Sequence, residues 1–185
     1  MLYLMRHGAP AVAGRLLGRT DDPATEAGIA ACAARAAGLD VARIEASDLT
    51  RARACADAIG SPRRLSVAVE PRWRELDFGA WDGLAPAAID PAALGAFYDD
   101  PDEAFPPGGE RWSGLHDRVA SALEAMLPVS TLVVSHGGAI RAALADLCGF
   151  DSRQIWAFDL PYAALVSLRV WPGPTRTVQI VGLAT

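Results

Sequence analysis

The chain has 185 residues, of which 51% are hydrophobic and 21% charged, and its formal net charge at pH 7 is −5. This length suits a single α/β domain over residues 1–185 and is short for two. The negative charge argues against a nucleic-acid-binding surface. Arg6 interrupts the apolar N-terminal run, which is then too short for a signal peptide or a membrane span, so we expect a cytoplasmic protein with no membrane partner.

Residues 2–5 form a short apolar run, typical of a buried strand, that ends directly before Arg6, His7 and Gly8. An open α/β sheet usually binds its ligand beyond the carboxyl ends of such strands. A guanidinium can grip two phosphate oxygens, and a neutral imidazole can accept and release a phosphoryl group. Gly8 would let the backbone come close. These residues indicate a phosphate site, with an ordinary polar turn as the alternative on this evidence alone.

A second strand end far along the chain has the same character. Residues 131–135 form another strand-like run, followed by His136, Gly137 and a helical stretch over 139–148. A helix N-terminus opened by glycine favours anions. His136 is therefore predicted to occupy the same kind of position as His7.

The third histidine, His116, lies within the helical stretch 113–127, where we expect it to be a solvated or capping residue. Neither His7 nor His136 has a cysteine or carboxylate nearby at the spacing of metal ligands. The sequence therefore favours chemistry that needs no metal and no cofactor.

The cysteines of the chain are Cys32, Cys55 and Cys148. Their odd number and wide spacing among helix-forming residues are typical of buried small side chains in a reducing compartment. A disulfide framework and a metal site are both poorly supported by this pattern.

The remaining elements are predicted from apolar periodicity and from capping residues. They are helices over 25–37, 50–59 and 113–127, strands over 42–47 and 65–69, and a hairpin of strands 163–171 and 176–181 around the turn 172–175. Thr25 is expected to cap the first helix, and Asp48 or Thr50 the second. The alternation predicts a three-layer α/β/α sandwich with a mostly parallel central sheet. The hydrophobic hairpin would offer the edge for a homodimer.

Glu75 precedes a turn that is rich in aromatic residues and glycine. A carboxylic acid beside those aromatic rings would be partly desolvated, which suits it to donate a proton to a leaving oxygen. Asp77 and Asp82 are the competing carboxylates, and Asp82 is expected to be an exposed turn residue.

The segment 84–112 contains five prolines, a short helical stretch and an acidic cluster at 99–103. A segment of this length in a compact domain is usually functional, so we expect a cap over the site, with a plain surface excursion as the alternative. Its acidity would disfavour bisphosphates and favour a monoester whose remainder is mostly uncharged.

Four blocks of the sequence resemble, in the right order, the signature blocks of the histidine phosphatase superfamily, which has the phosphoglycerate-mutase-like fold. They are RHG at 6–8, SDLTRA at 47–52, RELDFGAWDG at 74–83 and VVSHGG at 133–138. Within that superfamily the chain is most similar to the alpha-ribazole phosphatases of cobalamin synthesis. The similar stretches are LLGRTDDPATEAG at 16–28, ELDFGAWDGL at 75–84 and FPPGGE at 105–110.

The resemblance implies hydrolysis of a small-molecule phosphomonoester through a phosphohistidine. His7 would attack phosphorus, and Arg6, Arg51 and His136 would hold and neutralise the equatorial oxygens. Glu75, four residues before a glycine as the family's acid is, would protonate the leaving alcohol and then assist water. The substrate that the resemblance implies is alpha-ribazole 5′-phosphate.

Gly8, Gly137 and Arg19 complete the expected substrate contacts. In the resemblance, Arg19 belongs to a loop that borders the phosphate pocket, with a solvated loop arginine as the alternative reading.

The chain departs from the common family pattern at Ala9, Pro10 and Ala13, where many members carry phosphate-binding polar residues. One or two phosphate contacts of the wider family are therefore missing. Three alternatives stay open: a broad-specificity small-metabolite phosphatase, a phosphoglycerate mutase, and a catalytically weak phospholigand-binding protein.

Overall fold

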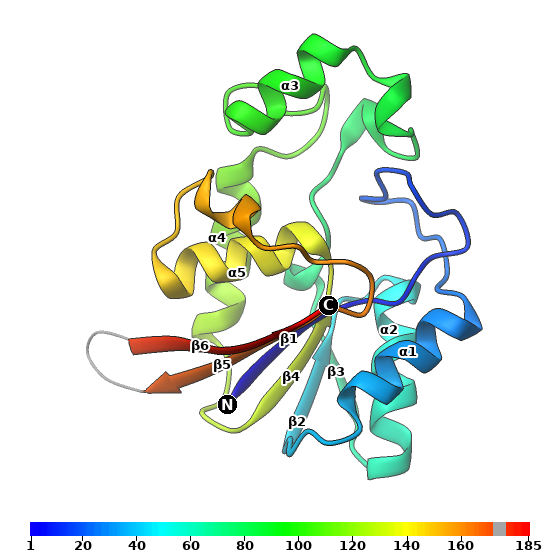
Figure 1. The fold of residues 1–185 in the computed structure, drawn as a ribbon, viewed down its shortest axis with the longest axis vertical. Coiled ribbons are helices and arrows are strands. Elements are labelled where there is room, and N and C mark those ends of the chain that lie inside the picture. The colour runs from blue at the N-terminus through cyan, green and yellow to red at the C-terminus, as the bar shows by residue number, and fades with distance from the viewer. Residues whose placement is uncertain (172–176) are drawn as a thin grey trace.

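The computed structural model describes residues 1–171 and 177–185, which form a three-layer α/β/α sandwich (Figure 1). The strands are β1 (Leu2–Arg6), β2 (Arg43–Ala46), β3 (Val67–Val69), β4 (Thr131–Ser135), β5 (Leu165–Trp171) and β6 (Thr177–Ala184). The α-helices are α1 (Glu26–Ala36), α2 (Thr50–Gly60), α3 (Pro91–Asp99), α4 (Trp112–Glu124) and α5 (Gly137–Cys148). The predicted fold class is confirmed.

The central sheet has the strand order β3-β2-β4-β1-β5-β6. The first four strands in this order run parallel, and β5 runs antiparallel to both β1 and β6. The expected turn at 172–175 lies outside the described residues. Strand β6 extends beyond its predicted end because Ala184 pairs with Leu165 at the start of β5. Val181 and Leu183 are exposed on this edge strand, where the homodimer stays a prediction.

Helices cover both faces of the sheet, with α1 and α2 packed together on one side and α4 and α5 on the other (Figure 1). Successive side chains of a strand point to opposite faces, so a central strand needs apolar residues on both. In β1, Leu4 joins the core under α4 and α5, while Met5 joins the core under α1 and α2. This explains why the N-terminal run is apolar without alternation.

Helix α1 is capped as predicted, because Thr25 Oγ1 accepts a hydrogen bond from the Gly28 N–H at 3.0 Å. The start of this helix lies against the chain that leaves β1. A Cβ on Gly8 would overlap the carbonyl oxygen of Gly28. Glycine at position 8 therefore allows a close approach of β1 to a helix.

Helix α2 begins differently from the prediction. Its N-cap is Leu49, which has no capping side chain, and Asp48 is bound to Arg74 instead. The cap comes from a distant loop: Asp21 Oδ1 accepts hydrogen bonds from Thr50 N at 2.7 Å and from Thr50 Oγ1 at 2.8 Å. Asp21 thereby ties the loop after β1 to the start of α2.

The cysteines are free thiols. Cys32 and Cys55 are fully buried between α1 and α2, as expected, whereas Cys148 is only half-buried. Cys55 Sγ accepts a hydrogen bond from the Gly8 N–H at 3.3 Å, and Cys32 Sγ donates to the Arg6 carbonyl at 3.7 Å. The two thiols thus support the backbone directly after β1.

The segment 84–112 extends away from the sheet and includes α3, which lies at the top of Figure 1. Phe97 of α3 packs edge-to-face against Trp81, with ring centroids 5.8 Å apart. Across the described ranges, no helix is long and apolar enough to cross a bilayer.

Candidate active site

The sheet register brings His7 and His136 together. Arg6 pairs with Ser135 at the ends of the parallel strands β1 and β4, and the His7 N–H donates to the Ser135 carbonyl at 2.8 Å. The residue that directly follows each strand is a histidine, His7 after β1 and His136 after β4. Their ring centroids lie 5.0 Å apart in an edge-to-face arrangement, and both side chains are buried.

His7 is a neutral imidazole with one defined free nitrogen. Burial, followed by the charge of Arg51, lowers its pKa to about 3. Its Nδ1 lies 2.7 Å from the Gly8 carbonyl oxygen, which can only accept, so the proton is on Nδ1. The lone pair of His7 Nε2 is therefore available to attack an electrophile.

Buried nitrogens without partners gather around these histidines. In the described part of the chain, the buried side-chain polar atoms that lack a hydrogen-bond partner are both ring nitrogens of His136 and the Nε atoms of Arg6, Arg51 and Arg141. Burial is the main cause that lowers the pKa of His136 well below its usual value, and the positive charges of Arg51 and Arg6 add to it. Unsatisfied buried donors cost free energy, so this cluster is suited to receive acceptor atoms from a ligand.

Arg51 lies in the first turn of α2 and is fully buried. Its Nη1 donates to the Thr20 carbonyl and its Nη2 to the Leu17 carbonyl, each at 2.7 Å. The loop that supplies these carbonyls is held by Asp82, which accepts hydrogen bonds from Gly18 N and Thr20 N at 2.8 Å. Asp82 lies in a turn, as expected, but it is half-buried rather than exposed because it holds this loop.

Arg6, the last residue of β1, is fixed from the β5 side of the sheet. Its Nη1 donates to the Leu160 carbonyl at 2.6 Å, and its guanidinium lies 4.3 Å from the ring centroid of Tyr162. The Tyr162 ring is also 5.5 Å from that of His7. Sequence reasoning missed Tyr162. The sequence did show that Tyr162 directly precedes a predicted strand. It did not show that this strand pairs with β1, which is what brings Tyr162 to Arg6.

Glu75 lies at the N-terminus of α5, beside His136, which is the N-cap residue of that helix. Its carboxylate accepts hydrogen bonds from Gly138 N at 3.0 and 3.1 Å and from Leu76 N at 2.8 Å. A Cβ on Gly138 would overlap Glu75 Oε1, so glycine lets the carboxylate come close to this backbone N–H. The first turn of α5 therefore positions both a histidine and a carboxylate.

Arg19 is close to Glu75 but is already paired. Its guanidinium forms an ion pair with Asp77 at 2.7 Å, and its side chain is 75% exposed. Arg19, Glu75 and Asp77 line a pocket of about 410 Å³ together with part of the segment 84–112. Asp77 also accepts a hydrogen bond from Gly79 N, so this competing carboxylate has structural partners.

Gly137 opens the space between two guanidinium groups. A Cβ there would lie 3.2 Å from Arg141 Nη1 and 3.7 Å from Arg6 Nε. By contrast, the Gly8 N–H is already bound to Cys55. Arg141, which sequence reasoning missed, thus lies beside Arg6 on the same side of the site. Its only signal was a position in the second turn of the helix after His136.

Arg118 of α4 binds the backbone of the segment 72–75, which includes Glu75. Arg118 Nη1 donates to the carbonyls of Arg72 at 2.8 Å and Arg74 at 2.7 Å, and Nη2 donates to that of Glu75 at 2.8 Å. Arg118 also forms a two-point ion pair with Glu110.

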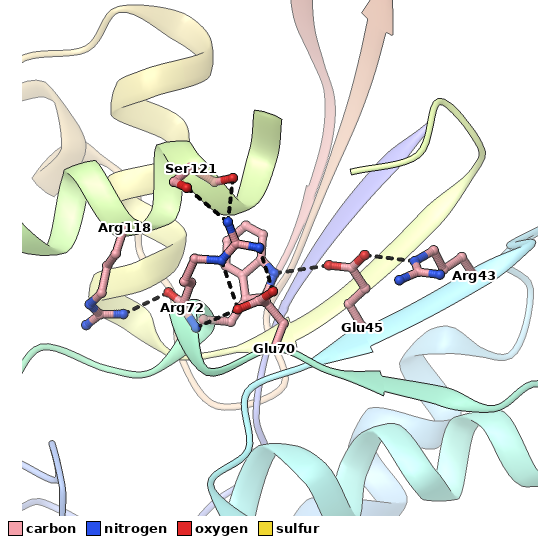
Figure 2. A network of polar contacts seen from close by, with 7 residues as sticks. Arg43, Glu45, Glu70, Arg72, Arg118 and Ser121 are labelled. Atoms are coloured by element: carbon pink, nitrogen blue, oxygen red, sulfur yellow. Dashed lines mark hydrogen bonds and ion pairs between the residues drawn. The ribbon is translucent and has the colours of Figure 1, made fainter. Parts of the chain in front are cut away.

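Figure 2 shows how this contact continues toward the sheet edge. The Arg72 guanidinium donates two hydrogen bonds to Glu70 and also reaches Ser121 of α4, while Glu45 of β2 accepts from the indole N–H of Trp73 at 3.2 Å. These contacts hold the backbone of residues 70–75 in place, and with it the position of Glu75.

His116 lies apart from this cluster, half-buried on α4, with its Nδ1 3.6 Å from Asp117 Oδ1. It lines a different pocket of about 550 Å³. Among residues 1–171 and 177–185, no group of three or more His, Cys, Asp or Glu side chains is placed to hold a metal ion.

The fold and the site define a class of protein: an α/β/α sandwich whose paired strand-end histidines lie among arginines that each keep a buried Nε without a partner, an arrangement suited to binding phosphate. The family model of the histidine phosphatase superfamily, branch 1, matches residues 2–181. The chain therefore belongs to the histidine phosphatase superfamily and is a hydrolase of phosphoric monoesters.

Similar proteins carry several names. A probable phosphoglycerate mutase GpmB of Proteus mirabilis is 31% identical over 163 residues, covering 82% of this chain and 76% of that protein. The structure of a mycobacterial glucosyl-3-phosphoglycerate phosphatase has a TM-score of 0.86 and 26% identity, covering 97% of this chain and 96% of the other. A putative alpha-ribazole-5′-P phosphatase from Escherichia coli K-12 has a TM-score of 0.81 and 25% identity, covering 97% and 94%.

Proposed function

We propose that the protein hydrolyses phosphomonoesters through a phosphohistidine formed on His7. The observation that supports this most directly is the defined, neutral Nε2 of a buried His7 beside partnerless donors on Arg6, Arg51 and His136. A neutral imidazole is the nucleophilic form, and preorganised donors neutralise the charge of the transferred group.

In the first step, the His7 Nε2 lone pair attacks phosphorus and the bond from phosphorus to the leaving oxygen breaks. Glu75 gives its proton to that oxygen, so the product leaves as an alcohol. In the second step, water attacks the phosphohistidine while the Glu75 carboxylate takes up a proton. Inorganic phosphate leaves, and His7 returns to its neutral form. The hydrogen bond from Gly138 keeps Glu75 beside His136 for both steps.

The three cationic or neutral donors divide the remaining work. Arg6 and Arg51 present their unpaired Nε atoms to the equatorial oxygens, and His136 adds a neutral donor at the start of α5. Because the carbonyls around Arg51 hold its two Nη atoms, its orientation is set before the substrate arrives.

For the substrate, we propose alpha-ribazole 5′-phosphate. The support is the resemblance of residues 16–28, 75–84 and 105–110 to alpha-ribazole phosphatases, together with the likeness to the Escherichia coli structure. We also propose a cytoplasmic location, in keeping with the free thiols of Cys32, Cys55 and Cys148.

The test is phosphate release, with a chelator present, from alpha-ribazole 5′-phosphate, 3-phosphoglycerate and a generic aryl phosphate. The matched variants are His7→Ala and His116→Ala, since His116 lies outside the site. We expect chelator-resistant turnover that favours alpha-ribazole 5′-phosphate, is lost in His7→Ala and is kept in His116→Ala. Rapid quenching should trap a phosphoryl group on the protein that survives alkali and is lost in acid.

Turnover that survives in His7→Ala or disappears with the chelator would contradict the phosphohistidine mechanism. Equal turnover of all three substrates would contradict the choice of alpha-ribazole 5′-phosphate alone. Conversion of 3-phosphoglycerate to 2-phosphoglycerate without phosphate release would indicate a mutase.

A further inference from the structure

Arg141 is a site arginine to which the proposed mechanism gives no role. Its Nη atoms make long hydrogen bonds to the carbonyls of Gly137 at 3.3 Å and Phe158 at 3.2 Å, and its buried Nε has no partner. The space at Gly137 has Arg141 on one side and Arg6 on the other. Arg141 therefore extends the row of donors one step beyond the phosphate-binding arginine.

Two aromatic rings continue this row outward. Trp156, in the short helix η5 (Gln154–Ala157), lies with its ring centroid 4.6 Å from the Arg141 guanidinium. Tyr98, at the end of α3, meets Trp156 edge-to-face at 5.3 Å. Trp156 is 40% exposed and Tyr98 is 43% exposed. Two touching aromatic residues from distant parts of the chain, both left open to solvent, are a surface suited to stacking on a planar group.

We infer that Arg141, Trp156 and Tyr98 form the leaving-group subsite, and that it takes monoesters whose alcohol bears a planar heteroaromatic ring on a sugar. This rests on the proposed function. With phosphate at Arg6, the adjoining sugar oxygens fall beside the underused donors of Arg141, and the ring reaches Trp156 and Tyr98. The acidic cluster at 99–103 directly follows Tyr98, so the ring is uncharged or cationic and bears no second anionic group.

The subsite is tested by equilibrium binding to His7→Ala, which cannot turn its ligands over. The probes are ribose 5-phosphate, alpha-ribazole 5′-phosphate and adenosine 5′-monophosphate, since the last two add a ring to the first. Base stacking on an aromatic side chain is worth enough to make each ring-bearing ligand bind about tenfold tighter than ribose 5-phosphate. Adding Trp156→Leu, or independently Tyr98→Leu, should bring that ratio down toward one.

Trp171→Leu is the matched control, because Trp171 is 43% exposed but stands at the far end of β5. It should leave the ratio unchanged. Equal affinity for all three probes, or an equal change with Trp156→Leu and Trp171→Leu, would overturn the subsite. The proposed function fails separately, if the unsubstituted protein releases phosphate from none of these monoesters.

Discussion

Two sets of arginines in this protein differ in how completely their N–H groups are used. All N–H groups of the Arg118 guanidinium donate hydrogen bonds, to three backbone carbonyls and to the Glu110 carboxylate. Arg6, Arg51 and Arg141 each keep a buried Nε without a partner. The first arrangement joins segments of the fold together, and the second leaves donors that we propose bind the substrate. Saturation of hydrogen bonds thus separates scaffold from site among residues of the same type.

Glu75 connects the two sets. Its backbone carbonyl is bound by Arg118, whereas its carboxylate accepts from Gly138 at the start of α5. A change on the scaffold side should therefore alter stability first, and a change on the site side should alter turnover first.

The largest effect on turnover is expected from Gly138→Ala. The new Cβ would overlap Glu75 Oε1 and displace the carboxylate, so kcat should fall by about 10²-fold, the usual effect of misplacing a reacting group by about 1 Å. Gly95→Ala in α3 is the control, because a Cβ there meets nothing within 4 Å. Steady-state kinetics on both variants measure this, and an unchanged kcat in Gly138→Ala would remove Glu75 from the mechanism.

The largest effect on stability is expected from Arg118→Met. The substitution keeps the aliphatic volume but leaves three carbonyls and Glu110 without their donor, which should lower the free energy of unfolding by about 3 kcal/mol. The exposed pair of Arg53 with Asp57 supplies the contrast, since Arg53→Met should cost no more than about 0.5 kcal/mol. Urea denaturation gives both values, and equal losses would show that Arg118 is an ordinary surface arginine.

The buried, neutral His7 makes the stability of the fold depend on pH. The pKa of His7 is lowered to about 3, so between about pH 6.5 and 3 the unfolded chain binds a proton that the folded chain does not. Stability should therefore fall as pH falls through that window. Relative to His7→Gln, the loss should approach about 1.4 kcal/mol per pH unit below pH 6. Parallel stability curves for the two proteins between pH 7 and 5 would contradict a buried neutral His7.

The sequence was sufficient wherever a local pattern decided the outcome. The apolar runs that end at Arg6 and Ser135 predicted two strand ends, each followed by a histidine, and the family resemblance implied that both histidines belong to one site; the pairing of β1 with β4 brings them together. Thr25 was found for the same reason, because an N-cap acts within its own turn. The three-layer fold followed from the alternation of such elements.

Features that depend on distant pairings could not be predicted in this way. Tyr162 reaches Arg6 only because β5 pairs with β1 in an antiparallel direction. The sequence of neither strand shows which strand it will pair with. Likewise, Asp21 caps α2 from a loop before α1, so Asp48 and Thr50 were the wrong candidates.

The smallest expected effect separates two helix caps that look alike. Asp21→Ala and Thr25→Ala each remove a side-chain acceptor from a helix start, and each should lower the free energy of unfolding by about 1 kcal/mol. Only Asp21 stands next to Thr20, whose carbonyl holds Arg51. Titration with inorganic phosphate should therefore show weaker binding for Asp21→Ala and not for Thr25→Ala. If both variants bound phosphate equally well, the loop would contribute to the fold without orienting Arg51.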